Sequence, residues 1–139
     1  MIGWREWVSL PELGNVILKA KIDTGARTSS LHAWNLALLN ENGEEYVTFE
    51  LHPIQRDNRK AAKCKAPLID RRIIKSSTGH RQQRFVISTL AQVGQHRWPI
   101  ELSLTRRDEM GFRMLLGRAA IREHFLINPG KSFLAGMPR

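Results

Sequence analysis

The stretch Lys19–Ala33, KAKIDTGARTSSLHA, runs from an alternating segment straight into an acidic turn. In the segment 16–22, VILKAKI, apolar side chains occupy every second position, which is the pattern of a half-buried strand. Asp23 follows this strand at once, and Gly25 comes two positions later. A carboxylate in this place is either part of an ordinary turn between strands or a catalytic group held on a tight loop.

The surrounding sequence predicts more short strands separated by turns. Asn42-Gly43 is a strong hairpin signal, Thr78-Gly79 lies near the tip of a second hairpin, and Pro99 indicates an edge position. After Gly117 a few good helix formers predict one short helix. The strands are expected at 5–10, 16–22, 31–38, 46–51, 71–75, 81–90 and 96–104, with short strands again around Pro129-Gly130 and a polar basic loop at roughly 52–63. We therefore expect a single, mainly β domain over residues 1–139.

Length and composition set further limits. The chain has 139 residues, a length that is enough to bury a core. Of these residues 42% are hydrophobic and 25% charged, which is typical of a globular protein. No apolar run reaches the roughly 18 residues that span a bilayer. Arg5 and Glu6 interrupt the N-terminus where a signal peptide would be apolar, and Cys64 is the only cysteine. We therefore expect a cytoplasmic protein without a membrane segment.

Basic residues outnumber acidic ones, 22 against 13, and give a formal net charge of +9. They are spread along the chain in small groups such as Arg71-Arg72 and Arg106-Arg107, unlike a disordered basic tail. Such a surplus attracts acidic partners of any kind. The four tryptophans indicate core anchors more than stacking platforms for nucleic acid, so we expect an acidic peptide or protein as the partner.

A second segment, 114–121, MLLGRAAI, bears on the acidic turn because its Gly117-Arg118 follows an apolar run. Asp-Thr-Gly-Ala early in a chain with Leu-Leu-Gly-Arg late resembles the retropepsin-like aspartic proteases. Nearly the whole chain is similar to the bacterial family called ATP-dependent zinc proteases. The matching blocks, in the order of that family, are 4–14, 19–33, 64–87, 106–121 and 131–136.

The resemblance implies a retropepsin-like closed β-barrel that assembles as a homodimer. Two carboxylates about 3 Å apart share one proton, and the ionised partner then acts as a base toward water. Because the chain has a single Asp-Thr-Gly, the second carboxylate would be Asp23 of another copy. In this family pattern Thr24 bonds across the two-fold axis, Gly25 allows close backbone approach, and residues 115–117 pack beneath the loop.

The hairpin 74–81, IKSSTGHR, is the candidate for a flap over the substrate, although its residues suit any exposed turn as well. The residues implied to contact substrate are Ala26, Arg27, Ser77, Thr78, Gly79, His80 and Arg118.

Arg27 departs from the retropepsin pattern, which has an acid at this position to pair with the later arginine. One hypothesis is that Arg27 and Arg118 bind a carboxylate of the substrate, a task that suits guanidinium groups. The alternative is that Arg27 points outward and pairs with Asp108 or Glu109.

The family name implies zinc and ATP, but the residues favour neither. The five histidines are scattered singly, without a His-Glu-x-x-His motif. The segment 129–132, PGKS, ends like a phosphate loop, yet Phe125 stands where the first glycine belongs. We expect no metal and no cofactor.

The resemblance and the basic charge together imply an aspartic-type peptidase that acts on acidic, glutamate-rich protein or peptide substrates. The resemblance also implies a functional association with a glutamate-adding, ATP-dependent ligase. Two alternatives stay open: a non-catalytic basic module that binds an acidic protein or RNA, and a zinc-dependent peptidase.

Overall fold

Strands make up most of the computed structural model, which describes residues 1–52, 61–75, 79–105 and 111–138. The described strands are β1 (Arg5–Leu10), β2 (Val16–Asp23), β3 (Ser29–His32), β4 (Trp34–Glu41), β5 (Glu44–Leu51), β6 (Ala62–Lys75), β7 (Arg81–Val93), β8 (His96–Thr105) and β9 (Met114–Gly117). One short helix, α1 (Arg118–Ile121), follows β9 directly. No helix among the described residues is long and apolar enough to cross a membrane.

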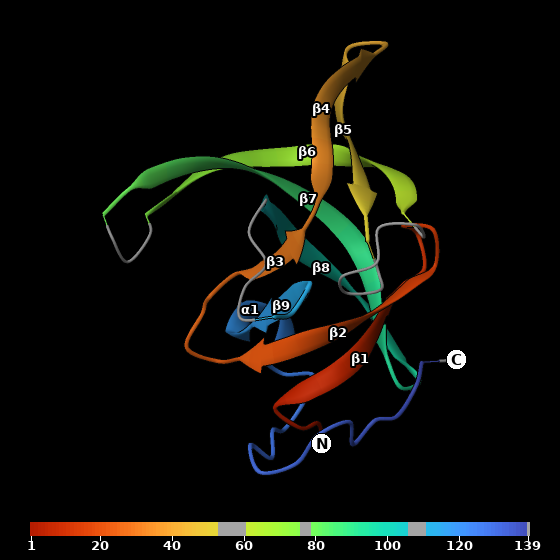
Figure 1. The fold of residues 1–139 in the computed structure, drawn as a ribbon, viewed down its shortest axis with the longest axis vertical. Helices are drawn as coiled ribbons and strands as arrows, with labels where there is room; N and C mark the ends of the chain where they lie inside the picture. The colour runs from red at the N-terminus through yellow and green to blue at the C-terminus, as the bar shows by residue number, and fades with distance from the viewer. Residues whose placement is uncertain (53–60, 76–78, 106–110, 139) are drawn as a thin grey trace.

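Six of the strands close into a barrel. Hydrogen-bonded neighbours run in the order β1-β2-β9-β3-β8-β7, and a pairing of Ser9 with Gln92 joins β7 back to β1. Strands β6, β5 and β4 continue from β7 beyond this closure. Figure 1 shows the far ends of β6 and β7 as a long arm and the β4–β5 hairpin as a second projection. The predicted closed β-barrel with one short helix is confirmed.

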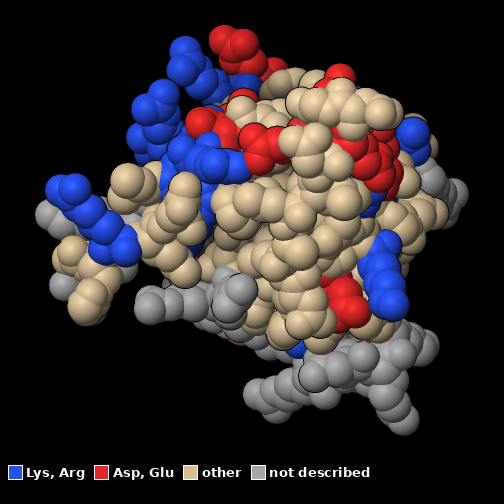
Figure 2. All heavy atoms as spheres, turned by 90° about the horizontal axis from the view of Figure 1, so that it is seen from above, with Lys and Arg blue, Asp and Glu red and all other residues tan. Residues whose placement is uncertain are grey.

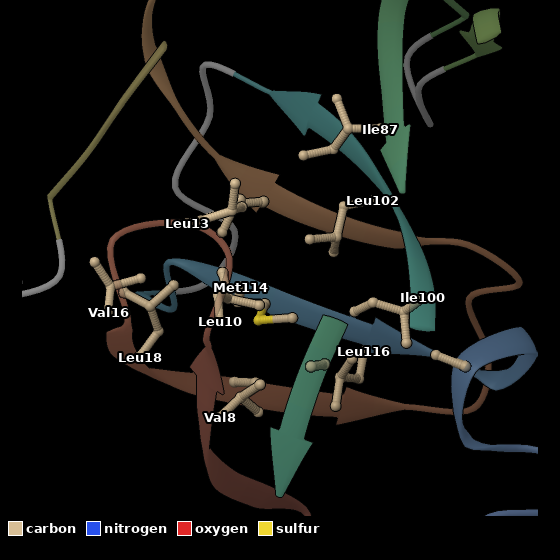
Figure 3. Packing of buried hydrophobic residues seen from close by; sticks show 14 of the residues in the cluster. Val8, Leu10, Leu13, Val16, Leu18, Ile87, Ile100, Leu102, Met114 and Leu116 are labelled. Carbon is tan, nitrogen blue, oxygen red and sulfur yellow. The ribbon is translucent and has the colours of Figure 1, made fainter. Parts of the chain in front are cut away.

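The core of the barrel follows the alternation of the strands. In β2, Val16, Leu18, Ala20 and Ile22 are buried, whereas the residues between them are partly or fully exposed. Figure 3 shows side chains of β1, β2, β7, β8 and β9 meeting inside the barrel. Val8, Leu18, Leu102 and Leu116 and the other labelled residues of Figure 3 are buried in one apolar cluster. Their burial is the main force that closes the sheet.

The Asn42-Gly43 turn is confirmed as the tip of the β4–β5 hairpin. Glu41 pairs with Glu44, so Asn42 and Gly43 form the whole loop. Both have positive φ, 53° for Asn42 and 85° for Gly43, as the two-residue turn that matches strand twist requires.

Two expected strands differ in the structure. The strand predicted at 31–38 is divided at Ala33, because β3 pairs with β8 whereas β4 turns away to pair with β5. Asn35 has a φ of 54°, and a register shift lies between Trp34 and Ala37, so the chain bends there. Pro99 lies in β8, which is an internal strand and not an edge. It precedes the β8 residues that pair with β3, so its missing N–H removes no hydrogen bond to β3.

The short strands predicted around Pro129-Gly130 are wrong. This segment forms an irregular chain with a single bridge between Ile127 and Ile2. It lies against the first residues of the protein, where Trp4 N–H donates to the carbonyl of Lys131 at 2.9 Å. The partner of the C-terminal segment is therefore the N-terminal segment, far away in sequence.

Glu6 joins the two ends of the chain. Its side chain is fully buried, and its carboxylate accepts hydrogen bonds from the backbone N–H groups of Gly3 at 2.6 Å, Leu134 at 2.9 Å and Ala135 at 3.1 Å. A buried carboxylate is tolerated only where such donors replace water. Glu6 thus accepts hydrogen bonds from three backbone N–H groups that no strand pairing would provide with an acceptor.

We predict that Glu6→Gln lowers the free energy of unfolding by about 2 kcal/mol. The glutamine side chain is uncharged, and its NH₂ group is a donor, so it cannot accept all three hydrogen bonds. Urea denaturation measures this loss. The control is Glu123→Gln, an exposed position where the change should stay within about 0.5 kcal/mol. Equal stability of the two variants would contradict the assigned role.

Candidate active site

Asp23 is the last residue of β2, and its side chain is partly exposed. The chain turns immediately afterwards: Gly25 N–H donates to the Asp23 carboxylate at 3.0 Å, and Ala26 N–H donates to the Asp23 carbonyl at 3.2 Å. The carboxylate is therefore oriented by its own turn. This geometry satisfies the Asx-type turn and leaves the group facing outward enough to reach another molecule.

Strand β9 supports the Asp23 turn from beneath. It runs parallel to β2, and Ile22 pairs with Leu116 and Asp23 with Gly117. Leu116 is fully buried. A Cβ on Gly117 would lie 2.6 Å from the carbonyl oxygen of Thr28 and 2.9 Å from that of Ala26, so only glycine fits. Leu116 and Gly117 therefore lie beside the end of β2 and its turn, whereas Leu115 pairs further back, with Lys21.

The chain after Gly117 is bonded to the same loop along its backbone. Arg118 N–H donates to the Ala26 carbonyl at 2.8 Å, and Ala119 N–H donates to the Arg27 carbonyl at 3.1 Å. Gly117 N–H donates to the buried hydroxyl of Ser29 at 3.0 Å. These three N–H groups precede or begin α1, where a helix lacks internal partners. The loop and the helix start therefore satisfy each other.

The Arg118 side chain adds a clamp. Its Nη1 donates to the carbonyl oxygens of Thr24 at 3.4 Å and Gly25 at 3.3 Å. These are long contacts, and the guanidinium keeps further N–H groups that point elsewhere. Arg118 therefore contacts the turn that carries Asp23, and its predicted contact with substrate stays a prediction.

The other predicted site residues lie in two places. Ala26 and Arg27 belong to the Asp23 loop, and the Arg27 side chain is exposed and forms no ion pair within the described residues. Gly79 and His80 are exposed at the end of the β6–β7 arm. Ser77 and Thr78 fall outside the described residues, as do Asp108 and Glu109, the proposed partners of Arg27.

Ser29 was missed at the level of sequence. It follows the loop as the first residue of β3, and its hydroxyl is buried under Gly117. The only available signal was the polar pair Ser29-Ser30 at the start of a strand, and a buried hydroxyl without an obvious partner is a weak signal.

A cavity of about 340 Å³ borders this junction on the side of α1. Its walls include Thr28, Ser29 and Ala119, with Trp98 and Ile100 as apolar surface, whereas Asp23 is not among them. This hollow therefore lies next to the loop that carries the carboxylate, while the carboxylate itself lies outside it.

A single carboxylate of this kind does not hydrolyse amides by itself, because the reaction needs an acid and a base together. Asp70 lies in β6, and hydrogen bonds from Arg72 and the Arg71 backbone hold its pKa below the usual value. Asp57 falls outside the described residues. Of the two aspartates in the described part of the chain, Asp23 and Asp70, only Asp23 lies beside β9.

The described residues also test whether a catalytic zinc ion would fit. Within them, no three His, Cys, Asp or Glu side chains come together in a way that could hold a metal ion. Cys64 is buried, and burial raises the pKa of its thiol to about 11, which disfavours the thiolate that metals bind. The residues around Asp23 therefore do not fit the zinc chemistry of the family name.

Comparison with known proteins gives a consistent result. Residues 1–138 match the model of the RimB-like family, described as "Retropepsin-like aspartic endopeptidase RimB". The chain is 48% identical over 136 residues to a "Probable alpha-L-glutamate ligase" of Shewanella halifaxensis and 50% identical over 129 residues to one of Desulfotalea psychrophila. The two matches include 98% and 93% of this chain but only 30% and 28% of the length of the two relatives.

One solved structure is similar over nearly its whole length. It is Lpg0085 of Legionella pneumophila, a protein of unknown function, with a TM-score of 0.80, 25% identity and 96% of each chain covered. This likeness supports the fold.

We predict that Gly117→Ala destabilises the protein by about 1–3 kcal/mol, because the new methyl group would collide with the carbonyls of Thr28 and Ala26. The control is Gly130→Ala, where the nearest atom would lie at 3.5 Å, an ordinary contact. Urea denaturation of both variants measures the difference. If the two changes had the same small effect, the close approach of β9 to the loop would be wrong.

Proposed function

The chain belongs to the RimB-like family of retropepsin-like aspartic endopeptidases, and on this premise we propose that it is an aspartic peptidase acting as a homodimer. The observation that carries the proposal is the junction of β2 and β9, which holds Asp23 on an ordered, partly exposed turn. The proposed substrates are acidic, glutamate-rich peptides or protein segments.

The homodimer follows from the chemistry of one carboxylate per chain. A two-fold axis between the Asp23 turns of two copies would bring their carboxylates together, one from each copy. At about 3 Å the two groups share a proton, since two negative charges at that distance repel strongly. Thr24 and Gly25 are exposed at the same turn, so they are available for contact with the partner copy.

Hydrolysis by such a dyad needs no covalent intermediate. The ionised Asp23 takes a proton from water, and the oxygen of that water attacks the amide carbonyl. The protonated Asp23 of the other copy gives its proton to the carbonyl oxygen. The tetrahedral gem-diol then breaks its C–N bond. The nitrogen gains the proton that the first Asp23 took from water, and a hydroxyl of the gem-diol gives its proton to the second Asp23, so the dyad returns to its starting state.

The choice of an acidic substrate is supported by charge. The formal net charge is +9, and viewed from above, basic side chains gather on the side from which the β6–β7 arm projects (Figure 2). Arg27 is exposed on the Asp23 loop itself, next to Arg118. A carboxylate of the substrate would find donors there, and the arm would close over it as a flap.

The relatives support a link with glutamate ligation. Those that match are named as alpha-L-glutamate ligases, and this chain corresponds to less than one third of their length. We propose that the chain works alongside a glutamate-adding, ATP-dependent ligase, and that chains of added glutamate are its substrates. A peptidase and a ligase of this kind would set the length of such chains by opposing reactions.

The first test is Asp23→Asn, which removes the ionisable group and keeps the shape of the side chain. We predict that hydrolysis of a glutamate-rich peptide falls at least about 1000-fold, because the dyad loses its base and its shared proton. Circular dichroism and urea denaturation show whether the fold is kept, and fluorescence anisotropy with the labelled peptide shows whether binding is kept.

Persistent hydrolysis in folded Asp23→Asn protein would exclude the aspartic mechanism. Tight binding without hydrolysis in the native protein would favour the second candidate, a basic module that binds acidic partners, for which the net charge of +9 is the supporting observation.

The second test addresses acidic specificity through Arg27→Ala. We predict about a threefold to tenfold higher KM for a glutamate-rich peptide and no change for the matched glutamine-rich peptide, because one charge-assisted hydrogen bond is lost. The control is Arg97→Ala, which changes the net charge equally but removes a guanidinium bonded to Gln92. The same rise in KM for both variants, or for both peptides, would contradict a local role of Arg27.

A further inference from the structure

Two histidines outside the Asp23 site face one another. His96 is the first residue of β8, and His124 lies just after α1. The Nε2 atom of His96 and the Nδ1 atom of His124 are 2.9 Å apart, and both residues are exposed to solvent. Nothing in the proposed hydrolysis uses either residue.

The two imidazoles are held in place by aromatic neighbours. The ring of Trp98 lies 5.1 Å from that of His96 and 5.4 Å from that of His124, and Phe125 meets His96 edge-on at 5.2 Å. Trp98 is itself fixed, because it is buried and its indole N–H donates to the carbonyl of Ala120 at 3.0 Å. The facing nitrogens are therefore positioned by a packed cluster, and their proximity does not depend on two free surface side chains.

We propose that His96 and His124 bind one divalent late transition-metal ion, with Cu²⁺ preferred over Zn²⁺. A neutral pair of imidazoles has one hydrogen between the two facing nitrogens, with one ring donating and the other accepting. When the donor ring shifts its proton through solvent to its other ring nitrogen, both imidazoles stay neutral and each facing nitrogen offers a lone pair to a metal ion. Imidazole is a preferred ligand of copper, nickel and zinc, and copper forms the strongest complexes of the series.

The spacing of the nitrogens fits adjacent positions around a metal ion. With metal–nitrogen bonds of about 2.0–2.1 Å, two ligands at right angles are about 2.9 Å apart, and two tetrahedral ligands about 3.4 Å apart. The observed 2.9 Å matches the right-angle arrangement that Cu²⁺ favours in tetragonal sites and lies about half an ångström short of the tetrahedral one. In the structure the two nitrogens are hydrogen-bonded to each other, so both rings would turn to direct their lone pairs at one ion.

The remaining positions would be filled by water, since both histidines are exposed. In the described part of the chain no third His, Cys, Asp or Glu completes the set. The site is therefore expected to bind more weakly than a closed structural zinc site with four protein ligands. It would also connect the β7–β8 turn to the end of α1, the helix whose first residue clamps the Asp23 turn.

The test uses the untagged protein and Cu²⁺ or Zn²⁺ alone. Isothermal titration is expected to give one Cu²⁺ per chain, with Zn²⁺ weaker, and at least about tenfold loss of Cu²⁺ affinity in His96→Asn and in His124→Asn, since each removes one of two protein ligands. His80→Asn is the matched control, an exposed histidine on the β6–β7 arm, and should bind Cu²⁺ as the native protein does.

A second measurement needs no variant: pulsed electron paramagnetic resonance of the Cu²⁺ complex should show two coordinated imidazoles. A single imidazole, Cu²⁺ affinity unchanged in His96→Asn, or equal loss in His80→Asn would overturn the proposal. So would the absence of a one-to-one complex with the native protein.

Discussion

The parallel pairing of β2 with β9 is the constraint on which the rest of the site depends. It places Gly117 beside Asp23, where a Cβ would collide with the carbonyls of Thr28 and Ala26. It also lets the N–H groups that begin α1 bond to the loop that follows Asp23. A parallel pair needs a long connection, and here the ninety residues 24–113 separate the two strands in sequence. The turn that orients the carboxylate is therefore held in place by a strand from the other half of the chain.

The same dependence on distant partners separates what the sequence could predict from what it could not. Alternation in 16–22 and the Asn42-Gly43 pair are local signals, and both describe the structure correctly, because a strand face and a two-residue turn are fixed by neighbouring residues. The segment around Pro129-Gly130 carried local turn signals too. Its hydrogen bonds go instead to the carboxylate of Glu6, 128 residues away for Leu134, and no local pattern encodes such a partner.

The candidate site divides in the same way. Asp23 and Gly117 were recognisable because an ionisable group and a close backbone approach each restrict the residue type. Ser29 was not, because a hydroxyl under a backbone N–H is visible only once two strands are aligned. The described structure adds that Arg118 reaches the carbonyls of the acidic turn, which gives this residue a role in holding the loop as well as the proposed role toward substrate.

The central claim is that one active site is shared by two copies of Asp23, and a heterodimer tests it most directly. Native chains and Asp23→Asn chains with different affinity tags are expressed together, and the mixed dimer is isolated on both tags. The account predicts that this mixed dimer hydrolyses a glutamate-rich peptide no better than the double Asp23→Asn dimer, since the dyad is incomplete. Half of the native activity in the mixed dimer would mean that each chain works alone and would contradict the account.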